Sequence, residues 1–238
     1  DYRAEAEWLR RFRFALGRDP AIVIPAVLPK LSTERILTMD RLTGRSLPQL
    51  MADGAADERA GVAATIFRFA MLGPLRHRLL NLDPNPGNYV VLPASESAPV
   101  RVGFIDFGCA TELPEDIVEA DRKLWLAMIH RDGEELRYAA HRSGLVANAA
   151  VFDTATFRDW ERALAGPFLS REPTQLGEAQ MRELVALTWN LVHTGRMALP
   201  PAALLLWRQR LGVLAVLGAL RPKLPMRRLL ADVLDDGE

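Results

Sequence analysis

Two short polar segments on either side of a pair of strand-like runs constrain this sequence more than any other feature. The first polar segment spans 81–88 and contains two prolines. Runs rich in branched and aromatic residues follow at 89–92 and 100–105 and predict a β-hairpin. The second polar segment, Asp106–Gly108, comes directly after the hairpin. Because a hairpin returns the chain to its starting point, we expect three polar side chains to lie in one cleft: Asp83, Asn88 and Asp106.

The sequence before the hairpin predicts a mixture of helices and strands. Apolar residues at spacings of three and four predict a helix over 1–16. Branched residues predict strands over 21–24 and 35–39. A long helix is predicted from about Glu58 to Leu80, with a bend at Gly73-Pro74 because proline lacks a backbone donor.

From about Pro114 onward the sequence predicts helices only, with turns near 132–133, 143–144, 171–174 and 200–201. The most apolar stretch, 197–220, carries Arg208 and Arg210 near its middle, where charges oppose membrane insertion. We therefore predict a buried helix there. Strands that come early and helices that come late indicate an α+β protein, a mixed lobe joined to a helical lobe.

Length and composition fit one large globular domain or two small lobes. The chain has 238 residues, of which 49% are hydrophobic and 25% are charged. Its 30 basic residues balance 30 acidic ones, which argues against nucleic acid as a partner. Cys109 is the only cysteine in the sequence and cannot form an internal disulfide, so we expect a reducing compartment such as the cytoplasm.

The two polar segments hold the residue types that phosphoryl transfer needs. That reaction uses a carboxylate to orient the acceptor and oxygen ligands that hold Mg²⁺ on the phosphates. Asp83 and Asn88 have a D-x-x-x-x-N spacing, and Asp106 opens a D-F-G triplet at the end of a strand. The residues alone also allow Asp83 and Asn88 to be turn residues and Asp106 a helix cap. That interpretation leaves the D-F-G triplet unexplained, which in kinases directs a carboxylate at Mg²⁺.

Several motifs resemble the AarF/UbiB family of atypical kinase-like proteins, which includes proteins that support ubiquinone biosynthesis. The resemblance rests on D-P-N-P-G-N at 83–88, F-I-D-F-G at 104–108 and the opening D-Y-R-A-E-A. Residues 25–27 and 37–44 also resemble strands and the hinge of that family, as does the late L-P-P. The central motif of the family is usually H-A-D-P-H-P-G-N, and here Asn81 and Asn85 replace both histidines.

The resemblance implies a protein-kinase-like fold and a role for each matching residue. It makes Asp83 the catalytic aspartate, Asn88 and Asp106 the Mg²⁺ ligands, and these two with Gly108 the residues that bind ATP. Glu5 would pair with the lysine that clamps the nucleotide, although its spacing alone also fits a solvated first helical turn. Residues 1–44 would be the remnant of a small lobe, a helix and two strands up to the hinge. Residues 45–238 would be a helical large lobe that carries the catalytic loop and the metal-binding hairpin.

The positions of the lysines set this chain apart from a whole kinase domain. Lys30, Lys123 and Lys223 all follow the first predicted helix, whereas a kinase places its phosphate-holding lysine on an earlier strand. The nucleotide loop rich in glycine or alanine and the K-x-G-Q segment of the family are missing too. We expect either a fragment with a truncated small lobe or a degenerate family member, and the lack of an initiator methionine favours the fragment.

The expected function is ATP binding with Mg²⁺, as a phosphotransferase or ATPase, in support of quinone or isoprenoid-lipid metabolism. The resemblance adds a lipid or quinone precursor as a candidate partner, and the surface of the inner membrane as a candidate location for a cytoplasmic protein. Two alternatives stay open. One is a small-molecule phosphotransferase of the aminoglycoside or choline kinase type, and the other is a pseudokinase that serves as a non-catalytic binding module.

Overall fold

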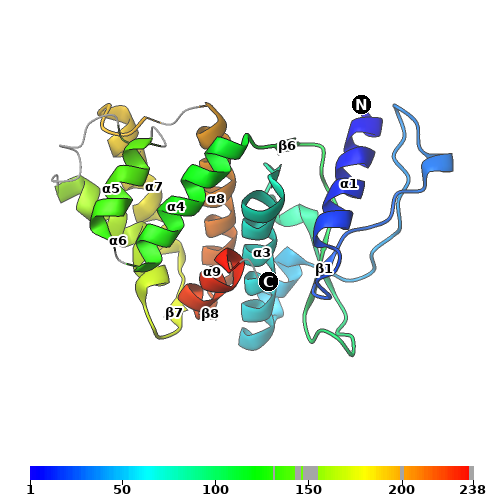
Figure 1. Ribbon diagram of the computed structural model, residues 1–238. Coiled ribbons are helices and arrows are strands. Elements are labelled where there is room, and N and C mark those ends of the chain that lie inside the picture. The colour runs from blue at the N-terminus through cyan, green and yellow to red at the C-terminus, as the bar shows by residue number, and fades with distance from the viewer. Residues whose placement is uncertain (131, 143–145, 147–154, 199–200, 236–238) are drawn as a thin grey trace. The chain divides into compact units, whose positions relative to one another are not determined.

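The structure is a computed structural model that describes residues 1–130, 132–142, 146, 155–198 and 201–235 (Figure 1). It divides into two compact units, Asp1–Glu112 and Leu113–Glu238. The first unit contains most of the strands and the second is mainly helical, which confirms the predicted α+β class. This division after Glu112 differs from the lobe boundary predicted at residue 44. The boundary at residue 44 concerns the two lobes of a kinase fold and stays a prediction.

Helix α1 spans Tyr2–Leu16 and confirms the first predicted helix. Asp1 caps it, because its side chain accepts a hydrogen bond from the backbone N–H of Arg3 at 2.9 Å. The buried stripe contains Ala6, Leu9, Phe12 and Leu16. Of the residues that predicted the helix, Phe12 and Leu16 lie in this stripe, whereas Trp8 and Ala15 are half-buried and Ala4 is exposed. This burial fixes the rotation of the helix, and therefore the direction in which Glu5 points.

The predicted hairpin is confirmed as strands β4, Tyr89–Leu92, and β5, Arg101–Phe104. The two strands pair antiparallel, with Tyr89 opposite Phe104. They form the centre of a four-stranded sheet of order β1-β5-β4-β2, in which β1, Ile22–Val23, runs parallel to β5. Strand β2, Arg45–Ser46, completes the sheet. The predicted strand at 21–24 is therefore confirmed as well.

The strand predicted at 35–39 is wrong. Only one isolated bridge forms there, between Val27 and Met39, and the short 3₁₀ helix η1 at Pro29–Leu31 precedes it. The reason is local competition by hydroxyl groups. The backbone N–H of Thr38 donates to the Ser32 hydroxyl at 3.0 Å, and the Thr38 hydroxyl donates to the Leu31 carbonyl at 2.7 Å. The first bond takes the backbone N–H of Thr38, a group that a strand at 35–39 would need for its ladder, and the second holds Thr38 against the η1 segment.

Helix α3 spans Ala56–His77 and contains Pro74, so the long helix forms but ends before Leu80. Arg78 adopts a left-handed conformation with φ of 61° and terminates it. The chain then forms strand β3, Leu79–Asn81, which pairs antiparallel with β6, Ala110–Glu112. A further helix, α2 at Leu47–Asp53, was not predicted.

Stacked aromatic rings form the core of the first unit. The rings of Phe69 and Phe104 stack at a centroid distance of 3.8 Å, and Phe12 contacts Phe107 at 4.8 Å. These four phenylalanines come from α3, β5, α1 and the D-F-G triplet. The core therefore anchors the D-F-G turn to the helix that carries Glu5.

The second unit confirms the predicted run of helices. They are α4 (Glu115–His130), α5 (Gly133–Arg142), α6 (Ala155–Leu169), α7 (Glu178–His193), α8 (Pro201–Leu220) and α9 (Met226–Leu234). A small ladder between β7, Thr174–Gln175, and β8, Lys223–Leu224, was not predicted. The turns predicted at 143–144 and at Pro200 lie outside the described residues.

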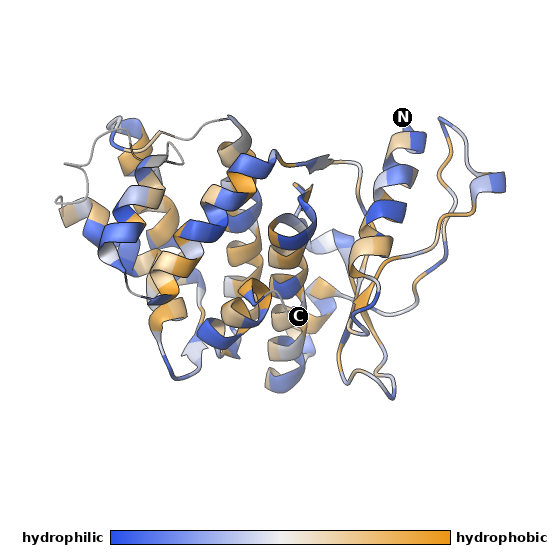
Figure 2. Ribbon diagram, in the orientation of Figure 1, coloured by the Kyte–Doolittle hydropathy of each residue, from blue (hydrophilic) through white to orange (hydrophobic). Residues whose placement is uncertain are grey.

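Hydrophobic residues occupy most of helix α8, as Figure 2 shows. Among the described residues, α8 is the one helix long and apolar enough to cross a membrane, over Ala203–Leu220. Of that window, 56% is buried inside the protein, and its Arg210 pairs with Asp121 of α4. These contacts are those of a helix packed among other helices, as the sequence predicted.

Candidate functional site

Asp83 and Asn88 are held together by the loop that follows β3. Asn85 shapes this loop, since its side chain accepts a hydrogen bond from the Gly87 N–H at 2.8 Å and its carbonyl accepts from Asn88 at 2.9 Å. The side-chain amide of Asn88 then donates to Asp83 Oδ2 at 3.0 Å. Because the amide nitrogen of Asn88 is used in this bond, its Oδ1 atom is the one left to bind a cation.

The side chain of Asn81 links this loop to the D-F-G turn. Its Oδ1 accepts a hydrogen bond from the Asp83 N–H at 3.2 Å, and its Nδ2 donates to the Asp106 carbonyl at 2.8 Å. The backbone N–H of Leu82 also donates to the Cys109 carbonyl at 3.1 Å. Asn81 is therefore a bracing residue, although in the sequence it stands out only because it replaces a histidine of the family motif.

Asp106 follows the hairpin, and the residue before it, Ile105, is hydrogen-bonded to the backbone of Asn88. The N–H of Ile105 donates to the Asn88 carbonyl at 3.2 Å, which extends the β4–β5 ladder to the edge of the loop. The Asp106 carboxylate accepts from the Gly108 N–H at 2.9 Å through one of its oxygens, Oδ1. Its other oxygen, Oδ2, is the natural cation ligand. The structure thus joins Asp83 to Asn88 through their side chains, links Asp106 to Asp83 through the side chain of Asn81, and ties the residue before Asp106 to the backbone of Asn88.

Glu5 faces the D-F-G turn from α1. A β-carbon placed on Gly108 would lie 3.4 Å from Glu5 Oε2 and 3.4 Å from Asp106 Oδ1. Glycine therefore leaves a narrow space between two carboxylates. Burial raises the pKa of Glu5, the negative charge of Asp106 raises it further, and a hydrogen bond from the Phe107 backbone opposes both. A cation between these carboxylates would relieve their repulsion.

The ring of Tyr89 lies in the same part of the first unit. Burial raises the pKa of Tyr89, and the negative charge of Asp83 adds to this rise. The ring packs edge-on against Phe104 at a centroid distance of 5.6 Å. Tyr89 therefore stays protonated and forms an apolar support near Asp83.

The donor set of this site suits Mg²⁺ bound together with phosphates. Among the residues that the structure describes, no group of three or more His, Cys, Asp or Glu side chains is placed to hold a metal by itself. Asp106 supplies a carboxylate oxygen and Asn88 an amide oxygen, and both side chains are half-buried. Mg²⁺ is commonly held by one or two such oxygens, with substrate phosphates and water as its other ligands.

The family follows from comparison with known proteins. Residues 1–140, more than half of the chain, match the ABC1 atypical kinase-like domain. The chain belongs to this family of AarF/UbiB atypical kinase-like proteins.

Its relatives include mitochondrial proteins. The chain is 27% identical over 132 residues to atypical kinase COQ8 of Saccharomyces cerevisiae, a match that covers 56% of this chain and 25% of the relative. It is 24% identical over 241 residues to atypical kinase COQ8B of Danio rerio, over 98% of this chain and 37% of the relative. The matches thus cover between 25% and 37% of the length of these relatives.

A solved structure confirms the protein-kinase-like fold. The complex of Rv3197 with erythromycin from Mycobacterium tuberculosis superposes with a TM-score of 0.73 at 21% sequence identity. The match covers 96% of this chain and 56% of that one. At this identity the likeness concerns the fold alone.

Proposed function

We propose that this chain contributes the Mg-ATP site of an atypical kinase-like phosphotransferase or ATPase. The observation that carries the proposal is the bond between Asn88 and Asp83 at 3.0 Å beside a D-F-G turn that Asn81 braces at 2.8 Å. Turn formation alone does not require these two loops to be joined, whereas a shared metal and nucleotide site does.

Each residue of the site has a distinct role in this proposal. Asp106 Oδ2 and Asn88 Oδ1 would hold Mg²⁺, which neutralises negative charge on the phosphates when it is bound. Asp83 would accept a hydrogen bond from the acceptor hydroxyl and orient its oxygen. Gly108 keeps open the space between Glu5 and Asp106. Glu5 would hold the cationic side chain that clamps the nucleotide.

The acceptor and the location are a finer part of the proposal. We infer a role in quinone or isoprenoid-lipid metabolism from the family motifs, with a lipid or quinone precursor and a membrane surface as partners. Relatives named as mitochondrial COQ8 proteins support this inference. For this chain we therefore infer a cytoplasmic location at the surface of the inner membrane.

Calorimetric titration with ATP in the presence and absence of Mg²⁺ tests the site. Asp106→Asn should reduce the Mg²⁺-dependent affinity at least about tenfold, because a neutral amide offers less charge to a hard cation. Asp116→Asn is the matched control, since Asp116 is exposed in the first turn of α4. Equal affinity in the wild type and Asp106→Asn would refute the metal assignment and favour a non-catalytic binding module.

Turnover separates catalysis from binding. Asp83→Asn should leave the affinity for Mg-ATP within about threefold of the wild type and slow turnover at least about a hundredfold, because the carboxylate acts mainly in the transition state. Equal losses of affinity in Asp83→Asn and Asp106→Asn would contradict the separate roles.

A further inference from the structure

The first unit contains a surface pocket that the proposed nucleotide site does not use. It is lined by the C-terminal end of α1, by strand β1 and by the loop that joins β4 to β5, and it offers about 420 Å³ of space. This volume lies in the range that small-molecule ligands occupy. Its lining contains none of the five residues assigned to the nucleotide site, which are Glu5, Asp83, Asn88, Asp106 and Gly108. The pocket is therefore a candidate site for a second, separate ligand.

Two arginines bring positive charge to this pocket. Arg101 is half-buried at the start of β5, and its side chain forms no hydrogen bond or ion pair with any residue that the structure describes. Arg13 donates through Nη1 to the Ile24 carbonyl at 2.9 Å, which holds its guanidinium beside β1. This bond leaves Nε and Nη2 of Arg13 as further donors.

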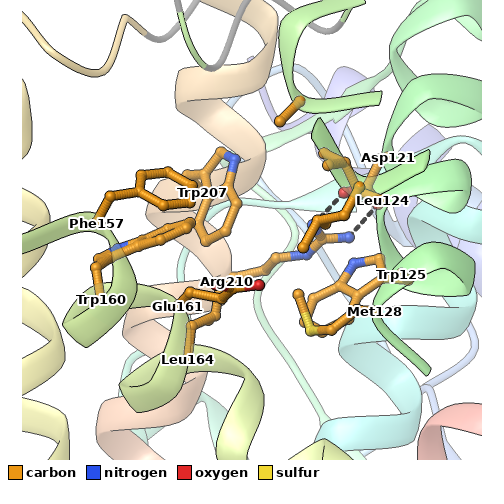
Figure 3. A pocket seen from close by; sticks show the side chains of 12 residues that line it. Asp121, Leu124, Trp125, Met128, Phe157, Trp160, Glu161, Leu164, Trp207 and Arg210 are labelled. Carbon is orange, nitrogen blue, oxygen red and sulfur yellow. Dashed lines mark hydrogen bonds and ion pairs between the residues drawn. The ribbon is translucent and has the colours of Figure 1, made fainter. Parts of the chain in front are cut away.

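A comparison with Arg210 in the second unit shows what Arg101 lacks. The two terminal nitrogens of Arg210 bind the two carboxylate oxygens of Asp121, as the dashed lines in Figure 3 show. Such a bidentate pair balances the charge of the guanidinium within the protein. Arg101 has no such partner among the described residues, so its charge is open to an anion from solution.

The acidic residue in the lining is already paired. Among the described residues that line the pocket, Asp19 is the only acidic one. One of its carboxylate oxygens forms an ion pair with Arg68, and the other accepts a hydrogen bond from the Ala21 N–H at 3.0 Å. Glu96, in the loop between β4 and β5, is exposed and lies outside the lining. The pocket therefore presents a net positive charge.

The loop between β4 and β5 adds two hydroxyl groups to the lining. The backbone N–H of Ser95 donates to the Ala98 carbonyl at 2.9 Å, and the Ala98 N–H donates back at 3.3 Å. This tight turn holds the hydroxyl oxygens of Ser95 and Ser97 at a distance of 3.2 Å. Two hydroxyls that share one hydrogen bond keep one proton that can be donated to an anion.

The remaining lining is largely apolar. It includes Pro20 and the residues Ile22, Val23 and Ile24 in and next to β1. Ile22 and Ile24 are buried, whereas Val23 is half-buried and Pro20 is exposed. Apolar surface thus lies in the same pocket as the two guanidinium groups. A ligand that matches both has an anionic group and a small apolar group.

We propose that this pocket binds a small phosphate monoester whose organic group is apolar. The phosphate oxygens accept hydrogen bonds from Arg13, Arg101 and a serine hydroxyl, and the organic group contacts Pro20 and Val23. A phosphate suits this donor set better than a carboxylate, because it offers three terminal oxygens to donors that come from three separate elements. The pocket shares no residue with the Mg-ATP site, so either proposal can fail while the other holds.

Calorimetric titration of the full chain with phenyl phosphate tests this proposal. EDTA in the buffer removes divalent cations, so that the proposed metal site cannot contribute. Inorganic phosphate should bind about three- to tenfold more weakly than phenyl phosphate, because it lacks the ring that covers apolar surface. Benzyl alcohol keeps a ring without the charge and should bind at least about tenfold more weakly. Phenyl phosphate should shift the amide NMR signals of residues 17–24 and 95–101.

Arg101→Gln should lower the affinity for phenyl phosphate about ten- to hundredfold, because a charge-assisted hydrogen bond is lost. Arg35→Gln is the matched control, since Arg35 is exposed and lies outside the pocket, and it should leave the affinity within about twofold. Ser97→Asp is a second pocket variant. Ser97 is exposed in a turn, so this change should spare the fold and repel the phosphate.

Four results would overturn the proposal. Phenyl phosphate may not exceed benzyl alcohol or inorganic phosphate in affinity, or it may not bind at all. The shifted amide signals may lie outside residues 17–24 and 95–101. Finally, neither Arg101→Gln nor Ser97→Asp may weaken binding more than Arg35→Gln does.

Discussion

Both the oxygen and the nitrogen of the Asn81 side-chain amide form hydrogen bonds. This makes Asn81 the key positioning residue of the site. Its oxygen fixes the backbone of Asp83, and its nitrogen fixes the carbonyl of Asp106. A side chain that spans two loops sets the distance between the groups that they carry. The position of Asp106 relative to Asp83 therefore depends on this amide together with the Leu82–Cys109 backbone bond and the pairing of β3 with β6.

Replacement of Asn81 by alanine should weaken binding of Mg-ATP at least about threefold and lower the free energy of unfolding by about 1–3 kcal/mol, since two hydrogen bonds are lost. Asn81→His should lose less of both, because an imidazole N–H can still donate to the Asp106 carbonyl. Calorimetry and urea denaturation measure the two effects. Identical losses in both variants would show that the donor to Asp106 does not matter.

The proximity of Glu5 and Asp106 gives a pH-dependent prediction. Carboxyl NMR should give Glu5 a pKa above the ordinary 4.5, and Asp106→Asn should lower it, because the repulsive charge is removed. The folded protein then binds this proton more tightly than the unfolded chain. The free energy of unfolding should therefore fall as pH rises from about 4.5 through the folded pKa, and Glu5→Gln should remove this fall.

Glu7→Gln is the control for this titration, because Glu7 is exposed and pairs with Arg10 on α1. It should leave the pKa of Glu5 unchanged. A Glu5 pKa that does not respond to Asp106→Asn would place the two carboxylates too far apart for the assigned site.

At the scale of elements, the end of α3 determines where the loop that carries Asp83 begins. Gly73 and Pro74 lie in the last turns of the helix, and the chain reverses at Arg78 to enter β3. A β-carbon on Gly73 would lie 2.7 Å from the carbonyl oxygen of Leu79, the first residue of β3. Glycine therefore allows the strand to pass close to the helix.

Gly73→Ala should lower the free energy of unfolding by about 1–3 kcal/mol, because a backbone carbonyl has to move. Gly166→Ala is a matched control. Gly166 also lies in a helix before a proline, Pro167, but, apart from its chain neighbours and the backbone of its own helix, a β-carbon there would have no atom of the described residues within 4 Å. Its substitution should change stability by less than about 1 kcal/mol in urea denaturation. Similar losses in both variants would assign the effect to the following proline alone.

Local signals explain which elements the sequence predicts correctly. The hairpin at 89–105 and helix α1 form as expected, because apolar residues recur at the period of each element, although only Phe12 and Leu16 of those that predicted α1 are buried. The helix α2 had a readable signal, a capping box between Ser46 and Gln49, that was overlooked. The prediction of a strand at 35–39 was wrong, because side-chain hydroxyls form hydrogen bonds with backbone groups of this segment and of the segment before it.

Contacts between distant residues explain what the sequence could not predict. The motifs identify Asp83, Asn88 and Asp106 by spacing, and the structure shows how they are linked. The brace from Asn81 to Asp106 joins residues 25 positions apart, and the ion pair of Asp121 and Arg210 joins residues 89 positions apart. No sequence pattern relates such partners, because their meeting depends on how whole elements pack.

At the scale of the whole molecule, the buried ion pair sets the stability of the helical unit. The side chains of Arg210 and Asp121 are 4% and 6% exposed. Arg210→Met should lower the free energy of unfolding by about 3–5 kcal/mol, because it leaves the Asp121 charge buried without a partner. The double variant Asp121→Leu/Arg210→Met should recover most of this loss.

Arg182→Met is the control for the buried pair. Arg182 forms an exposed ion pair with Glu178 on α7, and its loss should change stability by less than about 1 kcal/mol. Urea denaturation of the full chain measures all three variants. A loss in Arg210→Met no larger than in Arg182→Met would show that removal of Arg210 does not leave a buried, unpaired charge on Asp121.

The central claim is that the two loops of the first unit form one site for a metal and a nucleotide. NMR with Mn²⁺ in place of Mg²⁺ tests it most directly, because a paramagnetic ion broadens the signals of nearby nuclei. In the presence of ATP, amide signals of 83–88 and 105–109 should broaden together, and the effect should weaken along the hairpin toward 95–98. Asp106→Asn should abolish this broadening. Broadening of one loop without the other, or broadening that persists in Asp106→Asn, would contradict a shared site.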